Sequence, residues 1–185
     1  MDEQDPVTPS AENLLAAARG QKGPPPVHLW NPPYCGEIDI VIKRDGTWIH
    51  EGTPIGRTGL VRLFASILKK EDGRHYLVTP VEKVGLQVED APFVAVDFEA
   101  DADRIVFTTN VGDVVEAGPE HPIRVEHGAD GEPSPYVEVR AGLEALIDRK
   151  SFYRLVEIGE ERGGQFGLAS GGAFFPIIAA EKLEG

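Results

Sequence analysis

The fold class is decided by residues 36–50, Gly36-Glu37-Ile38-Asp39-Ile40-Val41-Ile42-Lys43-Arg44-Asp45-Gly46-Thr47-Trp48-Ile49-His50. Every second residue from 38 to 42 is isoleucine, and a period of two is typical of a strand that buries one face. Asp45-Gly46 then supplies a hairpin turn. If the loop has two residues, Ile42 pairs with Ile49 on the buried face and Lys43 with Trp48 on the other. The stretch predicts a β-hairpin.

A helix is expected after this hairpin. Thr58 can cap it, and the apolar residues that follow have the spacing of one buried helical stripe. These residues are Leu60, Leu63, Phe64, Ile67 and Leu68. Lys69 and Lys70 suit the negative end of the helix dipole.

Short strand-like segments fill most of the remaining chain. The expected strands are 75–79, 81–88, 93–98, 104–110, 114–117, 123–125, 136–139 and 152–158, with a last hairpin of 166–170 and 174–180. A second core helix is expected around 143–150, and a short, loosely attached helix over 11–20 precedes a Pro-rich segment. The pattern predicts an α+β, β-rich protein with mostly antiparallel sheets.

Two heptapeptides share the pattern R-x-G-L-x-x-L. They are Arg57-Thr58-Gly59-Leu60-Val61-Arg62-Leu63 and Arg140-Ala141-Gly142-Leu143-Glu144-Ala145-Leu146. They indicate two strand-strand-helix-strand repeats in tandem, although coincidence among common residue types is the alternative. The expected organisation is an N-terminal helix and Pro-rich lead-in over 1–33, a first α+β repeat domain over 34–112 and a second over 113–185.

Composition narrows the classes of function. A formal net charge of -13 argues against binding to nucleic acid or to anionic membranes. The single cysteine, Cys35, forms no internal disulfide and removes any multi-cysteine metal site. The first residues lack the profile of a signal peptide, and no apolar run approaches the roughly 20 residues of a membrane span, so we expect a cytoplasmic protein.

Several runs of sequence resemble a known family. They are Cys35-Gly36-Glu37-Ile38-Asp39-Ile40, Asp45-Gly46-Thr47-Trp48, Tyr76-Leu77-Val78-Thr79-Pro80-Val81-Glu82-Lys83-Val84, Val88-Glu89-Asp90-Ala91-Pro92-Phe93-Val94 and Val139-Arg140-Ala141-Gly142-Leu143. The chain is similar, over about residues 30–158, to the bacterial domain-of-unknown-function family numbered 1285. The resemblance implies an α+β fold with repeated motifs and a role in signal transduction. It implies no known reaction and brings no catalytic residues.

Two arginines are candidates for an anion site. Arg57 and Arg140 both precede an expected helix, where a cation opposes the positive end of the dipole. Together with free helix amides, a guanidinium there can bind phosphate or carboxylate. The alternative is a structural ion pair, for instance to Asp39 or Glu138.

Glu82 and Lys83 form a second candidate. In a regular strand Glu82 shares the parity of Val84 and points toward the apolar side, while Lys83 points away. An inward carboxylate requires a partner, for which Arg57, Arg140 and His121 are candidates. The alternative is that Pro80 resets the parity and leaves Glu82 in solvent.

Asp90 and His121 complete the candidates. Asp90 lies in a turn between two expected strands, and His121-Pro122 precedes another. No cofactor, metal or catalytic nucleophile is expected from the sequence, because its histidines lack zinc spacing and its serines lack a nucleophile elbow.

Three functions remain open. The first is a non-catalytic ligand-binding or signalling module that holds a small anionic molecule in a cleft between the two repeats. The second is a hydrolase that uses Glu82, Asp90 or His121 as acid/base groups, with or without a divalent metal. The third is a protein-interaction scaffold that docks through its Pro-rich lead-in or its apolar tail at 174–178.

Overall fold

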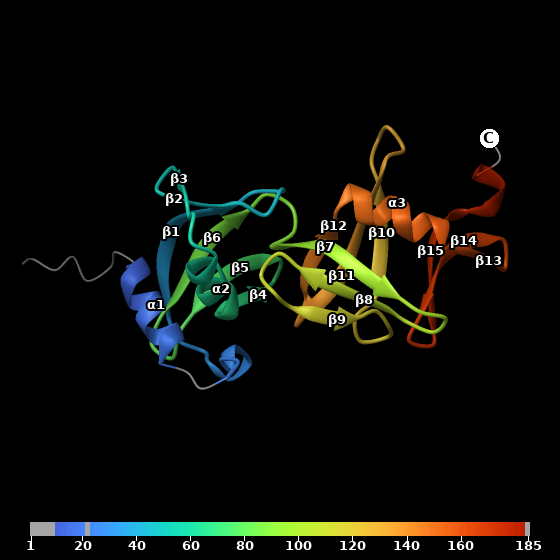
Figure 1. Ribbon diagram of the computed structural model, residues 1–185. Helices are drawn as coiled ribbons and strands as arrows, with labels where there is room; N and C mark the ends of the chain where they lie inside the picture. The colour runs from blue at the N-terminus through green and yellow to red at the C-terminus, as the bar shows by residue number, and fades with distance from the viewer. Residues whose placement is uncertain (1–9, 21–22, 184–185) are drawn as a thin grey trace, which may run out of the picture. The chain divides into compact units, whose positions relative to one another are not determined.

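The computed structural model describes residues 10–20 and 23–183. The chain forms two compact units, Met1–Asp90 and Ala91–Gly185, each with its own six-stranded sheet (Figure 1). The expected domain boundary at residue 112 was wrong, because it cuts through three consecutive strands that pair with one another over 93–116. The fold class is confirmed: the protein is α+β, β-rich and mostly antiparallel.

The first sheet has the strand order β3-β2-β1-β6-β5-β4. Its strands are β1 (Tyr34–Ile42), β2 (Trp48–His50), β3 (Thr53–Pro54), β4 (Leu68–Glu71), β5 (Arg74–Val78) and β6 (Lys83–Val88). The chain runs from the centre to one edge, crosses through a helix to the other edge, and returns to the centre. Only the central pair, β1 and β6, is parallel.

The second sheet repeats this path with the order β10-β11-β12-β7-β8-β9. Its strands are β7 (Phe93–Ala100), β8 (Ile105–Thr109), β9 (Val114–Glu116), β10 (Ile123–His127), β11 (Pro133–Arg140) and β12 (Leu143–Ile147). Only its central pair, β7 and β12, is parallel. The two sheets therefore contain the same six-strand path, in which β1 corresponds to β7 and β6 to β12.

The helices do not follow the repeat. α2 (Thr58–Ser66) connects the third and fourth strands of the first sheet, whereas α3 (Arg149–Glu157) follows the sixth strand of the second. The predicted helix over 143–150 was wrong: Leu143, Ala145 and Ile147 alternate with half-buried residues in β12. The expected strand over 152–158 is instead most of α3, because the Asp148 carboxylate accepts the Ser151 amide and caps that helix. The shared heptapeptides thus occupy different structures in the two units.

The register of the opening hairpin differs by one residue from the prediction. Ile42 pairs with Trp48, because the loop has three residues and ends at Gly46 with a φ of 93°. The Lys43 amide donates to the Thr47 carbonyl at 2.8 Å. This register turns Trp48 into the core, where its side chain is 1% exposed. Its ring stacks on that of Phe64 in α2, with 6.0 Å between the ring centres.

The N-terminal helix is a part of the first unit. α1 (Ala11–Arg19) packs against α2 and buries Leu14 and Ala18, so the expectation of a loosely attached lead-in was wrong. α2 ends at Ser66, and Lys69 and Lys70 lie in the edge strand β4 instead of in the last turn of the helix. Lysines on an edge strand discourage pairing with other chains.

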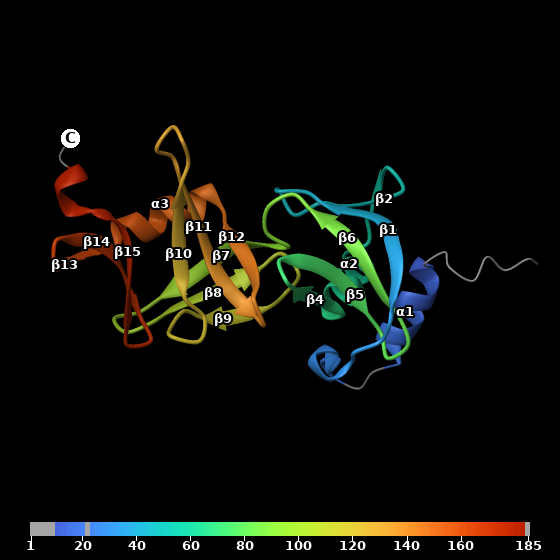
Figure 2. The same ribbon diagram turned by 180° about the vertical axis from the view of Figure 1, so that it is seen from behind.

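A small third sheet completes the second unit. It consists of β13 (Glu160–Arg162), β14 (Gln165–Ser170) and β15 (Ala173–Ala179), and its last two strands confirm the hairpin predicted across Gly171-Gly172 (Figure 2). The buried hydroxyl of Ser170 joins it to the larger sheet. That hydroxyl donates to the Ala117 carbonyl at 2.8 Å and accepts the Ile105 amide at 2.7 Å. Two short 3-10 helices, Val27–Leu29 and Ala180–Lys182, precede β1 and follow β15.

Candidate functional site

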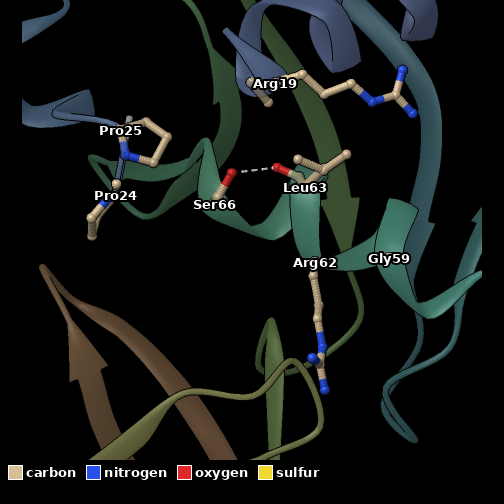
Figure 3. A pocket seen from close by; sticks show the side chains of 9 residues that line it. Arg19, Pro24, Pro25, Gly59, Arg62, Leu63 and Ser66 are labelled. Atoms are coloured by element: carbon tan, nitrogen blue, oxygen red, sulfur yellow. Dashed lines mark hydrogen bonds between the residues drawn. The ribbon is translucent and has the colours of Figure 1, made fainter. Parts of the chain in front are cut away.

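A groove lies within the first unit, between the end of α1, residues 23–25 and one side of α2 (Figure 3). Its volume is about 510 Å³, which is within the range of small-molecule sites. It is lined by Ala18, Arg19, Gly23, Pro24, Pro25, Gly59, Arg62, Leu63 and Ser66. Most of these residues are apolar or small, so the groove suits the apolar part of a ligand.

The α2 wall follows from helix geometry. Gly59, Arg62, Leu63 and Ser66 have the i, i+3, i+4 and i+7 spacing that places residues on one side of a helix. The Ser66 hydroxyl donates to the Leu63 carbonyl at 2.6 Å, which keeps its hydrogen within the helix. A Cβ added at Gly59 would meet nothing within 4 Å, so the wall is open at the first turn.

The first turn of α2 is also uncapped. Its N-cap residue, Arg57, makes no side-chain capping hydrogen bond. In the part of the chain that the structure describes, the amides of Thr58 and Gly59 have no acceptor. The positive end of the helix dipole is therefore unneutralised beside the groove.

The arginines of the chain divide into two groups. Most form an ion pair with a carboxylate: Arg44, Arg74, Arg104, Arg124, Arg140, Arg149, Arg154 and Arg162. Arg19, Arg57 and Arg62 form none with the carboxylates of residues 10–20 and 23–183. In a chain of net charge -13, these three are therefore the arginines of the described residues that are left without a carboxylate partner.

Two of these arginines line the groove and the third begins its α2 wall. Figure 3 shows the side chains of Arg19 and Arg62 extending in different directions, both away from Pro24 and Pro25. Neither has an ion pair to break, so each can turn toward a bound anion at the cost of side-chain entropy alone. The arrangement suits a molecule with an apolar body and an anionic group.

The structure gives the predicted arginines different surroundings. Arg57 is exposed at the start of α2, next to the groove but outside its lining. Arg140 ends β11 in the second unit, where its Nη1 lies 3.0 Å from Asp113 Oδ2 and its guanidinium lies 5.1 Å from the centre of the Phe93 ring. The carboxylate that pairs with Arg140 is therefore that of Asp113. Arg140 precedes the strand β12 instead of a helix.

Glu82 lies just outside the strand in which it was expected. β6 begins at Lys83, and the preceding turn is held by the Thr79 hydroxyl, which accepts the Glu82 amide at 3.1 Å. The Glu82 carboxylate is half-buried and has no partner among the described residues, and burial raises its pKa. Neither predicted alternative is therefore observed. The Glu82 carboxylate has no described partner, as an inward carboxylate would require, and it is not fully exposed to solvent.

Lys83 belongs to a cluster on the first sheet. Its Nζ lies 2.9 Å from Glu71 and 4.8 Å from the centre of the Tyr76 ring. Lys69 pairs with the same carboxylate at 3.1 Å, and the hydrogen bonds from Lys83 and Lys69 lower the pKa of Glu71. Lys69 also donates to the Trp30 carbonyl at 3.1 Å, so the polar contacts of this cluster are made within the first unit.

Asp90 and His121 also have local partners. Asp90 Oδ2 lies 3.6 Å from Arg44 Nε at the end of the first unit. In the second unit, the His121 ring Nδ1 lies 3.0 Å from the Glu138 carbonyl. None of the six predicted residues lines the groove.

Sequence reasoning missed Arg19 and Arg62. The helical spacing of Gly59, Arg62 and Ser66 was a usable signal for the α2 wall, but nothing in the sequence places α1 beside it. Among residues 10–20 and 23–183, no three His, Cys, Asp or Glu side chains are placed to hold a metal ion. None of the helices described is long and apolar enough to cross a membrane.

The fold defines a two-domain α+β protein whose sheets share one strand order, with a candidate ligand groove in the first domain. Residues 25–91 match "Domain of unknown function (DUF1285), N-terminal domain", and residues 92–177 match "Protein of unknown function (DUF1285), C-terminal domain". The chain belongs to the DUF1285 family, which confirms the resemblance seen in the sequence. The junction at residues 91 and 92 lies one residue after the division between the two units, which falls between Asp90 and Ala91.

Two solved structures are similar to this chain. A DUF1285 family protein from Silicibacter pomeroyi DSS-3 has 61% identity and a TM-score of 0.87, over 93% of this chain and 98% of that one. A DUF1285 family protein from Shewanella baltica OS155 has 32% identity and a TM-score of 0.52, over 64% of this chain and 90% of that one. No curated protein matches the chain.

Proposed function

We propose that the protein is a cytosolic, non-catalytic ligand-binding module that holds a small amphipathic anion in the groove of its first unit. One observation carries the proposal. The three arginines without a described carboxylate partner are Arg19 at the end of α1, Arg57 at the N-cap of α2 and Arg62 in the middle of α2, and two of them, Arg19 and Arg62, line the groove. A role in signalling is consistent with binding that is coupled to the position of α1.

The groove supplies the apolar part of the binding energy. Full burial of a methylene group stabilises a complex by about 0.8 kcal/mol, so an alkyl chain of about eight carbons, half-buried in an open groove, gains about 3 kcal/mol. A charge-assisted hydrogen bond from an arginine contributes about 1.5–3 kcal/mol more. Two such bonds give a total of about 6–9 kcal/mol, before the cost of association is subtracted. With the smallest such cost, about 4 kcal/mol, about 2–5 kcal/mol remains, so we expect a dissociation constant of about 0.2–30 mM for a simple probe of this kind.

Isothermal titration calorimetry with octyl phosphate tests the proposal. Octyl glucoside has the same alkyl chain without the charge, and inorganic phosphate has the charge without the chain. We expect octyl phosphate to bind more tightly than both, because it alone uses the groove and the arginines together.

Two variants connect binding to the named residues. Arg62→Ala and Arg19→Ala should each weaken octyl phosphate binding by roughly tenfold, the effect of losing about 1.4 kcal/mol. Arg149→Ala, which removes one exposed positive charge from the second unit, is the matched control. Equal affinity in all three variants, or equal binding of octyl phosphate and octyl glucoside, would show that the arginines do not bind the anion.

A further inference from the structure

The lining of the groove comes from two different helices. Ala18 and Arg19, at the end of α1, line one part of it together with residues 23–25, and one side of α2 lines the rest (Figure 3). A ligand that fills the groove therefore contacts both helices. Its binding depends on α1 lying against α2.

The attachment of α1 to the rest of the first unit is apolar. Leu14 and Ala18 are its buried residues, at 0% and 5% exposed, and the helix packs against α2. Among the residues that the structure describes, no hydrogen bond or ion pair joins α1 to another element. A helix of nine residues is only marginally stable by itself in water, so α1 depends on this docking for its own structure.

The α2 wall is fixed more firmly. Phe64 and Ala65 are each 2% exposed, and the Phe64 ring stacks on that of Trp48 in the first sheet. The residues that match the N-terminal family domain begin at residue 25, so they contain the first sheet and α2 but not α1. The groove therefore combines a wall that belongs to the core of the first unit with a wall that few buried contacts hold in place.

No ion pair joins the two walls within the described part of the chain. Arg19 on α1 and Arg62 on α2 have no carboxylate partner there, and Figure 3 shows their side chains pointing in different directions. An anion with an apolar body adds contacts to both helices that the protein without ligand lacks. The docking of α1 thus rests on Leu14 and Ala18, and a ligand in the groove strengthens it.

We propose that α1 is a movable wall whose docking on α2 is coupled to ligand binding in the groove. This inference rests on the proposed function, because it concerns the regulation of the same site. A ligand that needs both walls binds only the docked state, so it increases the docked fraction, and a change that weakens docking weakens binding. Undocking removes the Ala18 and Arg19 part of the groove and uncovers the side of α2 on which α1 lies. Ligand binding then changes a surface of the first unit that a partner can recognise.

Amide hydrogen exchange of the full-length protein, followed by NMR, measures the docking of α1. Without ligand, we expect the amides of residues 15–19 to exchange about tenfold faster, or more, than those of β5 and β6, because α1 opens while the sheet stays folded. Octyl phosphate at about three times its dissociation constant should slow their exchange about fourfold, since the docked state gains the factor of one plus the ratio of ligand concentration to dissociation constant. Octyl glucoside and inorganic phosphate at the same concentration should slow it less.

Leu14→Ala tests docking apart from the groove lining, because Leu14 is fully buried but does not line the groove. The variant should speed exchange of the α1 amides, with unchanged chemical shifts of β5 and β6 as the sign that the first sheet remains folded. It should weaken octyl phosphate binding by about tenfold, since the apparent dissociation constant increases as the docked fraction falls. Leu155→Ala is the matched control: Leu155 is also 0% exposed, but it lies in α3 of the second unit, and the variant should leave the affinity within about twofold.

Three outcomes would overturn the coupling. The first is exchange of α1 as slow as that of β5 and β6, since α1 would then open only with the whole unit. The second is octyl phosphate binding that leaves α1 exchange unchanged, or that stays unchanged in Leu14→Ala while α1 exchange becomes faster. The groove would then still bind the anion, and the proposed function would stand without the movable wall. The third is the absence of octyl phosphate binding to the parent protein, which would remove the proposed function as well.

Discussion

Replacement of Ser170 by alanine should be among the most damaging single-atom deletions in the second unit. Ser170 is 1% exposed, and its hydroxyl both donates to the Ala117 carbonyl and accepts the Ile105 amide. The Ser170→Ala variant leaves two backbone groups buried without partners. At about 1–3 kcal/mol for each unsatisfied group, the free energy of unfolding should fall by about 3 kcal/mol.

Ser151 provides a matched control in the same unit. It is 0% exposed, but its hydroxyl has no hydrogen-bond partner among the described residues. Ser151→Ala therefore removes a buried polar atom without leaving a group unpaired, and should change the free energy of unfolding by less than about 0.5 kcal/mol or increase it.

Urea unfolding followed by circular dichroism measures both variants, with thermal unfolding as a check, since 1 kcal/mol corresponds to about 4–8 °C for a unit of this size. The reasoning fails if the two serine variants lose the same stability. It also fails if Ser170→Ala costs less than about 1 kcal/mol, because the bridge between the third sheet and the larger sheet would then be unimportant.

Three further predictions concern other buried groups. Burial lowers the pKa of His75 to about 4 from 6.5, so the unfolded chain binds more protons between these values and the folded state loses stability as the pH drops through them. The full shift corresponds to about 3 kcal/mol, and solvent screening of this partly buried ring reduces the expected loss to roughly 2 kcal/mol; His75→Gln should abolish this part of the dependence in pH-dependent unfolding, and an unchanged dependence would contradict it. Gly167→Ala should destabilise the second unit by more than about 2 kcal/mol in urea unfolding, because the new Cβ would lie 2.2 Å from the Phe175 carbonyl oxygen; unchanged stability would contradict the close approach. Burial raises the pKa of Glu82, so the ionised carboxylate is disfavoured in the folded state. Glu82→Gln should therefore increase the melting temperature at pH 7, where the carboxylate is ionised, but not near pH 3, where it is protonated. A decrease at pH 7 would indicate a partner for the carboxylate.

The strands were predictable where the sequence alternates clearly. Ile38, Ile40 and Ile42 alternate with more exposed residues and all three are buried, as predicted. The same alternation is present from Leu143 to Ile147, where the likeness of two heptapeptides indicates a helix but the chain forms a strand. Local alternation is the stronger signal because it reflects the environment of each residue, whereas a short shared pattern can occur in two different structures.

The hairpin register depended on one loop residue. Asp45-Gly46 is a turn signal in both two-residue and three-residue loops, and the two differ in whether Trp48 faces the core. A large apolar Trp beside a predicted helix favours the register that buries it, so packing with Phe64 decides what the turn sequence leaves open.

The candidate site was not predictable as a whole. It arises where α1 packs against α2, and contacts between helices that are far apart in sequence leave no local pattern. Arg57 was identified from its position before a helix, but Arg19 and Arg62 lie on ordinary helix surfaces. Only the structure shows that they lack the carboxylate partners that most arginines of the chain have.

Titration of the isotopically labelled protein with octyl phosphate, followed by amide NMR, locates the bound anion most directly. We expect the amides of Gly59, Arg62, Leu63 and Ala18 to shift together with one dissociation constant, and those of the second unit to remain unchanged. Shifts confined to the second unit, or none at concentrations where calorimetry detects heat, would contradict an anion site in the groove.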